Sequence, residues 1–250
     1  MPTLSLPEDP TQTEVPSPPV AMPFLSHLEE LRTRLIWCAI AVGVTSTLTF
    51  FYAPVLIRIL QHSAPKAVDY IQLYPGEEFL SSFKLSLLTG LGLALPVVLY
   101  HIARFTTPGL SPKEKRLIFP LLAVSTVLFA AGVVFGYYAV LPFMLDFLLG
   151  YGQEIARNQL SIAKYLDFCM GFLLASGLVF QLPVLLLFLS FFKLITSQKL
   201  ISQWKWAIVG SFIVGAVITP SADPFSQTFM AIALLGLYGI SILLIKACGR

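Results

Sequence analysis

The sequence predicts an all-α polytopic membrane protein with six transmembrane helices. Of its 250 residues, 56% are hydrophobic and only 12% are charged, whereas an average soluble domain carries about 25% charged residues. The apolar residues gather in runs about as long as a helix that crosses ~30 Å of hydrocarbon. A soluble fold of this length would enclose too little volume to hide so much apolar surface.

The apolar runs place the six expected spans. A span requires about 20 apolar residues, and the runs lie near residues 35–53, 79–102, 118–142, 165–190, 205–219 and 226–246. The fifth run is short for a bilayer, and the turn signal PSADP follows it at once. Spans five and six should therefore form a tight hairpin, and we expect the bilayer to thin beside them.

Residues 1–21 precede the first span and differ from it in composition. They are rich in proline, acidic, and free of lysine and arginine. They therefore lack the basic and apolar regions of a secretory signal peptide. We expect a disordered cytoplasmic tail over 1–21, followed by a single membrane domain over 22–250.

Lysine and arginine are distributed unevenly between the two sides of the predicted spans. With a cytoplasmic N-terminus, eleven of these residues fall on the inside and four on the outside. This bias follows the positive-inside rule and predicts that both termini lie in the cytoplasm. Lys84 is left over, early in the second span, where it is either near the outer interface or buried.

Proline residues interrupt several of the expected spans. Pro96 and Pro183 lie within the second and fourth, and Pro120 and Pro142 punctuate the third. Each proline removes a backbone hydrogen bond and bends its helix. One interpretation is the ordinary tolerance of proline in membrane helices. The other, which we adopt for the fold, is a cupped bundle of bent helices with a shared concave face.

The stretch FLSHLEELRTRLIW precedes the first long apolar run and contains Glu29 and Glu30. Ser26 and Glu29 fit a capping box at a helix start. Leucines at helical spacing favour an amphipathic helix that lies in the membrane interface before the chain turns into the bilayer. Glu30 has two interpretations: an ion pair with Arg34 one turn later, or a site for a cationic ligand.

Glu114 lies in the loop between the second and third spans, in a setting similar to that of Glu30. Ser111 and Glu114 fit a second capping box, with Pro112 at the first helical position. Both acids nevertheless lie at cytoplasmic entrances to spans, among basic residues. Two carboxylates at one membrane surface suit a cationic ligand, and arginine is the natural partner because its fork binds carboxylate bidentately.

Four segments resemble the signature segments of the TatC family, the multispanning receptor subunits of the twin-arginine protein translocase. They are FLSHLEELRTRL, YPGEEFLSSFKLSL, ALPVVLYHIARFTTPGLSPKEKR and ITPSADPFSQT. They occur in the right order and on the right sides of the six expected spans, and the resemblance runs from about residue 22 to 246. It implies export of folded proteins across an energised membrane, driven by the protonmotive force and without a cofactor.

The same resemblance implies partners and a location. The family binds signal peptides that carry adjacent arginines, and it works with small single-span subunits, TatA and TatB. We therefore expect a multi-pass protein of a bacterial cytoplasmic membrane that contacts these subunits, membrane lipid and further copies of itself. Nucleic acid is not an expected partner, because the net charge is only +3 and the charges form short clusters.

The resemblance also assigns roles to individual residues. Glu30 and Glu114 match the two family carboxylates that receive the arginines of the signal. The remaining positions of the implied signal-peptide site are His27, Leu31, Arg32, Pro96 and Phe105. A second set matches regions of partner docking or of the polar concave face: Glu77, Phe79, Gln181, Asp223 and Gln227. Gln181 stands where the family often has a glutamate, and an amide cannot titrate, so only a polar docking contact is expected there.

A secondary transporter of a small solute is the main alternative. Transporters usually place ionisable pairs at the bilayer midplane, whereas the acids of this chain lie mainly at the surfaces. An enzyme is not expected, because the three histidines lie in different regions and neither G-x-S-x-G nor a P-loop is present. The spacing of Cys38, Cys169 and Cys248 fits neither a metal site nor a disulfide framework.

Overall fold

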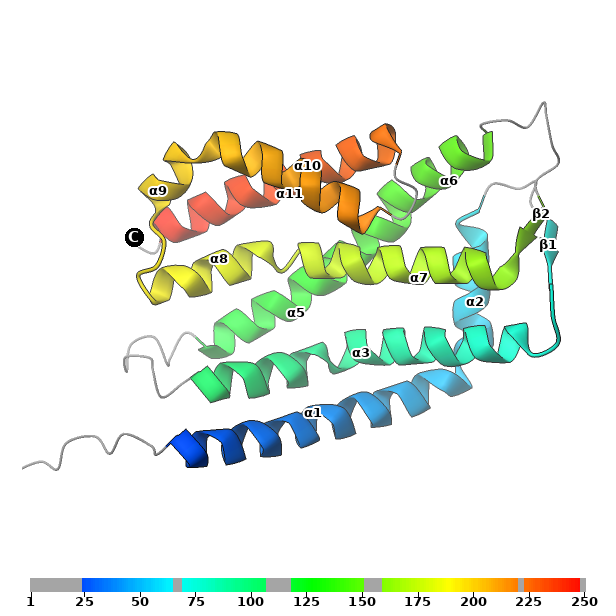
Figure 1. Cartoon of the computed structure of the whole chain (residues 1–250), viewed down its shortest axis with the longest axis horizontal. Helices are drawn as coiled ribbons and strands as arrows, with labels where there is room; N and C mark the ends of the chain where they lie inside the picture. Colours follow the sequence, from blue (N-terminus) through cyan, green and yellow to red (C-terminus); the bar gives the residue numbers. More distant parts are fainter. Residues whose placement is uncertain (1–23, 65–68, 107–117, 151–158, 220–222, 248–250) are drawn as a thin grey trace, which may run out of the picture.

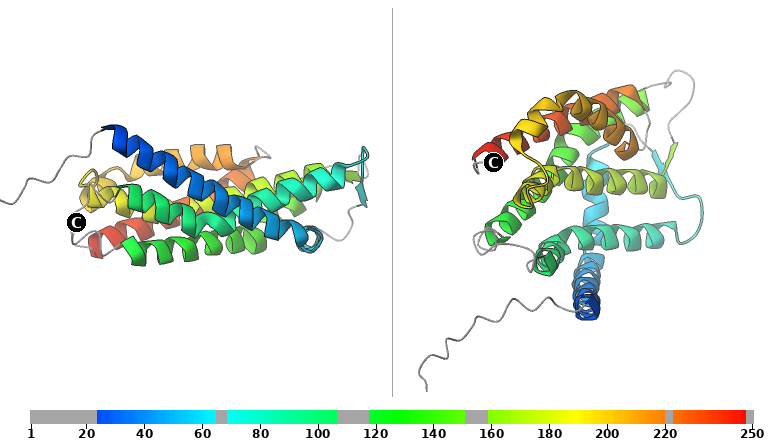
Figure 2. Two further views of the ribbon diagram at one scale, coloured as in Figure 1. Left: turned by 90° about the horizontal axis from the view of Figure 1, so that it is seen from below. Right: turned by 60° about the vertical axis from the view of Figure 1, so that its left-hand side comes forward.

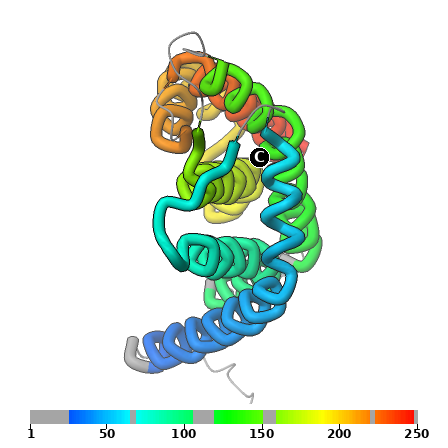
Figure 3. Tube along the Cα trace, turned by 90° about the vertical axis from the view of Figure 1, so that its right-hand side faces the viewer, coloured from blue at the N-terminus to red at the C-terminus, as the bar shows by residue number. Residues whose placement is uncertain are grey.

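The computed structural model describes residues 24–64, 69–106, 118–150, 159–219 and 223–247. Five long apolar helical regions and one shorter apolar helix, Trp204–Ile218, lie within these ranges. Most of them run roughly side by side (Figure 1). Seen from one end, the helices follow an arc (Figure 3), so the prediction of a cupped helical membrane protein is confirmed.

The first span, α1 (Phe24–Phe51), is a single uninterrupted helix. It begins two residues before Ser26, so the predicted capping box does not mark its start, and no break separates an interfacial helix from the span. The apolar stripe continues from the first turns into the span with the same helical spacing, and nothing in the sequence ends the helix between them. α1 lies at the edge of the bundle (Figure 2).

α3 (Glu77–Thr106) packs along α1 and contains Pro96 within its length. The contact is close because small residues face each other: a Cβ on Gly90 would lie 2.3 Å from Ser46 Oγ. Two threonine hydroxyls of α1 cross to the backbone of α3, Thr45 to the Gly90 carbonyl and Thr49 to the Ser86 carbonyl, each at 2.8 Å. These contacts fix the register of α1 on α3.

In chain order, α2 (Ala53–His62) lies between α1 and α3. It is a short amphipathic helix that was not predicted from the sequence. It runs across one end of the long helices instead of along them (Figures 1 and 3). Its buried side chains are Ala53, Ile57 and Leu60, at the i, i+4, i+7 spacing of one helix face.

The third span comprises α5 (Ile118–Phe135), the π-helical turn η2 (Gly136–Val140) and α6 (Leu141–Gly150). It therefore extends beyond residue 142, where the sequence analysis ended it. The fourth comprises α7 (Ile162–Val179) and α8 (Leu182–Phe191), which a turn at Phe180 and Gln181 separates. This break confirms the predicted bend at Pro183, whose ring excludes a regular helix in the turn before it.

The short helix α9 (Ser197–Ser202) leads into α10 (Trp204–Ile218), which packs against α11 (Pro224–Ala247). The 15 residues of α10 span about 22 Å, less than the ~30 Å of a typical hydrocarbon core. The expected pairing of a short fifth span with the sixth is therefore confirmed.

A pair of three-residue strands closes the end of the bundle opposite the start of α1 (Figure 1). β1 (Asp69–Ile71) and β2 (Gln159–Ser161) pair in parallel, with Asp69 opposite Gln159. The largest fully buried apolar side chains come from α6, α7 and α11: Leu141, Met144, Leu166, Phe172 and Met230. The core therefore lies between these helices, and α1 is mostly exposed to the surroundings of the protein.

Candidate functional site

The first turns of α1 and the last turns of α3 meet at the end of the bundle where α1 begins. The His27 and Phe105 rings stack there, with centroids 4.1 Å apart and planes 13° apart. Beside them is an open cavity of about 530 Å³, whose lining includes Ser26, Glu29, Glu30, Thr33, Arg34, Trp37, Tyr100, His101 and Arg104. We call this cavity the polar cavity. Of the predicted site residues, Glu30 lines the polar cavity, and the stacked rings of His27 and Phe105 lie beside it.

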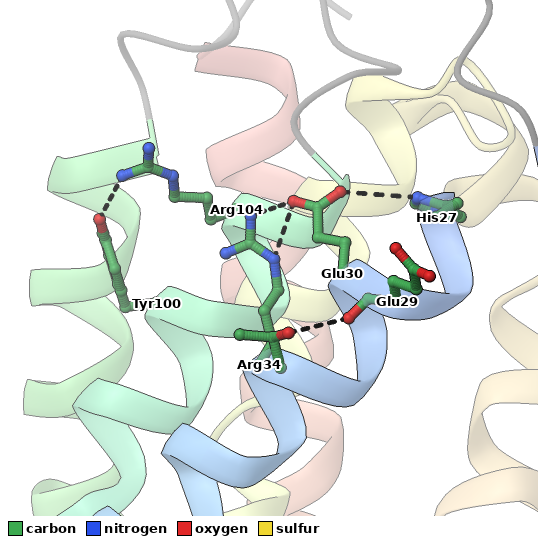
Figure 4. Close-up of polar contacts among 7 residues, drawn as sticks. His27, Glu29, Glu30, Arg34, Tyr100 and Arg104 are labelled. Carbon is green, nitrogen blue, oxygen red and sulfur yellow. Dashed lines mark hydrogen bonds and ion pairs between the residues drawn. The ribbon is translucent and has the colours of Figure 1, made fainter. Parts of the chain in front are cut away.

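The two carboxylate oxygens of Glu30 have different surroundings (Figure 4). Oε1 accepts hydrogen bonds from Nε of Arg34 at 3.0 Å and from Nη2 of the same residue. Oε2 is buried, lies 3.7 Å from Nδ1 of His27, and accepts no hydrogen bond from any residue that the structure describes. The predicted pair with Arg34 is therefore present, and it uses one of the two oxygens.

A carboxylate has acceptor sites on both oxygens, so Glu30 retains capacity for a donor. The Glu30 side chain is 25% exposed and the Arg34 side chain 16% exposed. A charged group that is partly withdrawn from water gains more from a new hydrogen-bond donor than one that is fully solvated. Because Oε2 is buried and its neighbour at 3.7 Å is His27 Nδ1, a donor group that enters the polar cavity would reach this oxygen only if the His27 side chain moved aside.

Glu29 differs from Glu30 although the two are adjacent. It is exposed, and its carboxylate projects away from Arg34 (Figure 4). Its backbone carbonyl accepts a hydrogen bond from Thr33 Oγ1 at 3.0 Å. Both acids line the polar cavity, but Glu30 is held by Arg34 whereas Glu29 is exposed, so the two neighbouring acids offer a matched pair.

The remaining predicted signal-site residues lie farther from the polar cavity or outside the described residues. Leu31 and Arg32 are exposed on α1, and neither lines the cavity. Pro96 lies two to three turns before Phe105 on α3, about 14 Å along the helix axis. Glu114 falls within 107–117, outside the residues that the structure describes.

The second predicted set does not form one cluster. The Glu77 side chain is 1% exposed, and its carboxylate accepts from Leu73 N at 2.6 Å, Ser161 Oγ at 2.5 Å and Ala163 N at 3.2 Å. Phe79 is 67% exposed, with the Phe50 ring edge-on at 6.1 Å. Glu77 thus joins the start of α3 to β2 and α7, and this explains its burial without a partner protein.

Gln181, Asp223 and Gln227 each form contacts within the helical bundle. The Gln181 amide donates to the Ser125 carbonyl at 3.0 Å and accepts from the Ser125 hydroxyl, which connects the α7–α8 turn to α5. Asp223 Oδ1 accepts from Ser226 N at 2.7 Å and so caps α11. Gln227 Nε2 donates to the Phe212 carbonyl of α10 at 3.0 Å. A docking role for these residues stays a prediction.

The sequence analysis missed several residues of the polar cavity wall. Arg104 Nη1 donates to Tyr100 Oη at 2.8 Å, and the spacing of four residues between them was the signal that these side chains share a helix face. His101 Nδ1 is buried and has no hydrogen-bond partner among the described residues. Trp37 and Thr33 supply the α1 wall. Helix α3 runs to Thr106, and this extension brings Arg104 to the cavity and Phe105 to His27.

Known proteins are similar to this chain in both sequence and fold. Residues 26–232 match the family described as Sec-independent protein translocase protein (TatC). A protein of that name from Synechocystis sp. is 38% identical over 237 residues, or 95% of this chain and 92% of that protein. The chloroplastic TATC protein of Pisum sativum is 36% identical over 230 residues, or 92% of this chain and 65% of that protein.

A crystal structure titled as the twin arginine translocase receptor TatC aligns with a TM-score of 0.77. It is 40% identical in sequence, and the alignment covers 90% of this chain and 100% of that one. These relatives are components of a protein translocase, and they do not belong to a catalytic family. The alternative function, transport of a small solute, is therefore not favoured. The extent of the match, both along the sequence and in space, establishes that this multi-pass membrane protein belongs to the TatC family of Sec-independent protein translocases.

Proposed function

We propose that this chain is the receptor subunit of a twin-arginine translocase, and that Glu30 and Glu114 bind the two arginines of a signal peptide. The observation that carries the proposal is the open acceptor capacity of Glu30. Its Oε2 atom has no hydrogen-bond donor among the described residues and belongs to the wall of the polar cavity. A guanidinium group is a planar donor that suits such an oxygen.

Two separate carboxylates suit two adjacent arginines. In an extended peptide, successive side chains point to opposite faces, so one carboxylate cannot hold both guanidinium groups well. Glu30 comes from α1 and Glu114 from the segment after α3, whose last turn, with Phe105, contacts His27 of α1. Each acid would take one arginine. Lysine lacks the planar fork, so a peptide with two lysines should bind more weakly.

The apolar part of the signal peptide would follow its arginines into the bilayer. The exposed apolar side chains of α1 offer a surface for it, among them Leu31 beside Glu30. Arg32 would lie at the level of the lipid headgroups, where basic residues are favoured on the cytoplasmic side. The distribution of lysine and arginine supports the proposal that the start of α1 and both termini lie at the cytoplasmic face of a bacterial membrane.

Small single-span subunits of the TatA and TatB type are the proposed partners, together with further copies of this chain. A single-span helix gains from small residues and from polar groups that can form hydrogen bonds in a membrane. Gly215 and Gln227 already form contacts between α10 and α11, so we expect a partner helix on the exposed apolar face of the short α10, which includes Ile213 and Val217. Transport of folded precursors with this assembly would draw on the protonmotive force.

Peptide cross-linking tests the role of the two carboxylates. A photoreactive twin-arginine peptide is added to wild-type membranes and to membranes with the double variant Glu30→Gln, Glu114→Gln, and precursor export is measured in parallel. We expect cross-linking and export to be lost in the double variant, and a twin-lysine peptide to label the wild type weakly. Cross-linking and export at wild-type levels in the double variant would exclude this assignment.

A further inference from the structure

A second cavity, of about 590 Å³, lies between α3 and α5 at a distance from the polar cavity. We call it the α3–α5 cavity. Residues of α7 form its floor, and residues of α2 and η2 line the end that lies near β1 and β2. Its walls include Leu93, Pro96, Phe129, Val134, Tyr138 and Leu173. No residue of the α3–α5 cavity belongs to the polar cavity.

The lining of the α3–α5 cavity is almost entirely hydrocarbon. Its hydroxyl-bearing side chains are those of Thr89, Thr126, Tyr137 and Tyr138, and none of the described residues that line it is charged. Apart from α2, each wall belongs to a helix long and apolar enough to cross a membrane. An occupant must therefore be apolar, and it reaches the cavity from the hydrocarbon of the bilayer.

Contacts between helices hold the shape of the cavity. Phe129 packs closely on two glycines, since a Cβ on Gly177 would lie 2.5 Å from its ring and one on Gly92 would lie 3.1 Å from it. Tyr137 Oη donates to the Ile59 carbonyl of α2 at 2.7 Å. Larger residues at either glycine would push Phe129 out of its place. The cavity is therefore a preformed feature of the fold.

The π-helical turn η2 places two tyrosines together at one end of the cavity. Tyr137 is anchored on α2, while Tyr138 is 74% exposed and stands edge-on to Tyr137 at 4.8 Å. Single π-helical turns often occur at functional sites. Tyrosine rings prefer the boundary between hydrocarbon and headgroups. The cavity therefore has an amphipathic end and an apolar body, the same division that a membrane lipid has.

The volume of the α3–α5 cavity distinguishes between two possible apolar occupants, a transmembrane helix and a lipid acyl chain. A helix about 10 Å wide with a rise of ~1.5 Å occupies roughly 120 Å³ per residue, so the cavity would hold only about five residues of a span that needs about 20. An acyl chain is far thinner and fits lengthwise. We propose that the α3–α5 cavity binds one acyl chain of a membrane phospholipid, with the headgroup of that lipid beside Tyr137 and Tyr138.

Photolabelling with lipid tests this site in the full-length protein. The chain is placed in nanodiscs of phosphatidylethanolamine and phosphatidylglycerol that contain a phospholipid with a photoreactive diazirine on its acyl chain, and labelled peptides are mapped by mass spectrometry. No signal peptide is added, so failure of this test leaves the proposed role of Glu30 and Glu114 unaffected. We expect label concentrated on the residues of α3, α5 and α7 that line the cavity.

Two variant pairs locate the label. Val134 lines the cavity and Val127 does not, although both are valines of α5, 54% and 65% exposed. Val134→Phe should remove most of the label from the cavity, and Val127→Phe should leave it unchanged. On the opposite wall, Leu93→Trp is compared with Leu87→Trp in the same way, because Leu87 is exposed on α3 outside the cavity. Size-exclusion profiles verify that each variant is folded.

Two results would overturn the proposal. One is label spread evenly over the lipid-exposed helices, or equal labelling of the cavity in all four variants. The other is found by adding a twin-arginine peptide that is photoreactive in its apolar segment. Labelling of the cavity by this peptide in the absence of lipid labelling would assign the site to the signal peptide instead.

Discussion

Glu30 and Glu77 are both carboxylates in the first turns of long apolar helices, at opposite ends of the bundle, and their surroundings differ. Glu77 accepts hydrogen bonds from three segments of the chain, the loop before α3, the end of β2 and the first turn of α7. Glu30 contacts only its neighbours on the same helix, Arg34 through Oε1 and His27 through an ion pair of 3.7 Å, and Oε2 accepts no hydrogen bond from the described residues. Glu77 therefore has the environment of a structural residue, and Glu30 that of a receptor residue.

The difference between the two environments predicts that Glu77 contributes to the stability of the fold and that Glu30 contributes to the binding of a ligand. A buried acceptor with three donors stabilises the fold, because its removal leaves three donors without partners. A partly exposed acid with unused acceptor capacity contributes little to the fold and is available to a ligand. Variants at the two positions should therefore change different measurements.

The largest expected effect is on thermal stability at Glu77. Glu77→Ala removes the acceptor of Leu73 N, Ser161 Oγ and Ala163 N, and we expect the Tm to fall by roughly 5–10 °C. The measurement is thermal unfolding of the purified protein in one detergent. Glu78→Ala is the control, because Glu78 is exposed and its carboxylate accepts a hydrogen bond from Gln72 Nε2 on the protein surface. Equal Tm values for the two variants would contradict the structural role that we assign to Glu77.

The second effect concerns the affinity for a twin-arginine peptide. Glu30→Gln keeps the shape of the side chain and removes its charge, so the loss of a charge-assisted hydrogen bond should weaken binding by about tenfold or more. Fluorescence anisotropy of a labelled peptide measures the Kd. Glu29→Gln should leave the Kd unchanged, and the Tm of both variants should stay at the wild-type value. A drop in Tm for Glu30→Gln would show that the residue has a structural role.

A smaller effect is expected for the aromatic stack that joins α1 to α3. Phe105→Leu keeps apolar volume and removes the ring beside His27, and a stacked pair contributes about 0.5–1.5 kcal/mol beyond its buried area. The peptide Kd should therefore rise severalfold, because the polar cavity wall loses rigidity. Phe83→Leu, at an exposed phenylalanine of α3 outside the polar cavity lining, is the control. An unchanged Kd for Phe105→Leu would show that the stack does not support the site.

The smallest effect is expected between Gln181 and Ser125. A double-mutant cycle with Gln181→Leu and Ser125→Ala should give a coupling energy of about 0.6 kcal/mol, the average for hydrogen bonds between membrane helices. Unfolding in mixed detergent provides the free energies. Zero coupling would mean that the bond from the Ser125 hydroxyl does not stabilise the fold, and that the Ser125 carbonyl is the contact that holds Gln181 against α5.

The spans and their bends could be predicted because hydrocarbon imposes simple requirements. Long apolar runs mark the helices, and Pro183 marks the break between α7 and α8. Glu30 could be singled out because an acid at the entrance to a span is costly unless it has a partner. Its pair with Arg34 followed from their spacing alone.

Other features depend on contacts between distant segments and were not predicted. The β1–β2 pair consists of two three-residue strands, too short to show a periodic pattern in the sequence. The buried state of Glu77 depends on Ser161, 84 residues later. The polar cavity also needs Tyr100, His101 and Arg104, and Arg104 belongs to its wall only because α3 continues past residue 102, the predicted end of the second span.

The parallel pairing of β1 with β2 also has a consequence for biogenesis. The residues between these strands include α3, α5 and α6, so all three must be threaded through the membrane before the strands can meet. A ribosome-bound chain that ends before β2 would expose Glu77 without the donors of Ser161 and Ala163. The strand pair can therefore form only after α3, α5 and α6 have been synthesised, and Glu77 gains the donors of Ser161 and Ala163 at that stage, before α8 to α11 complete the bundle.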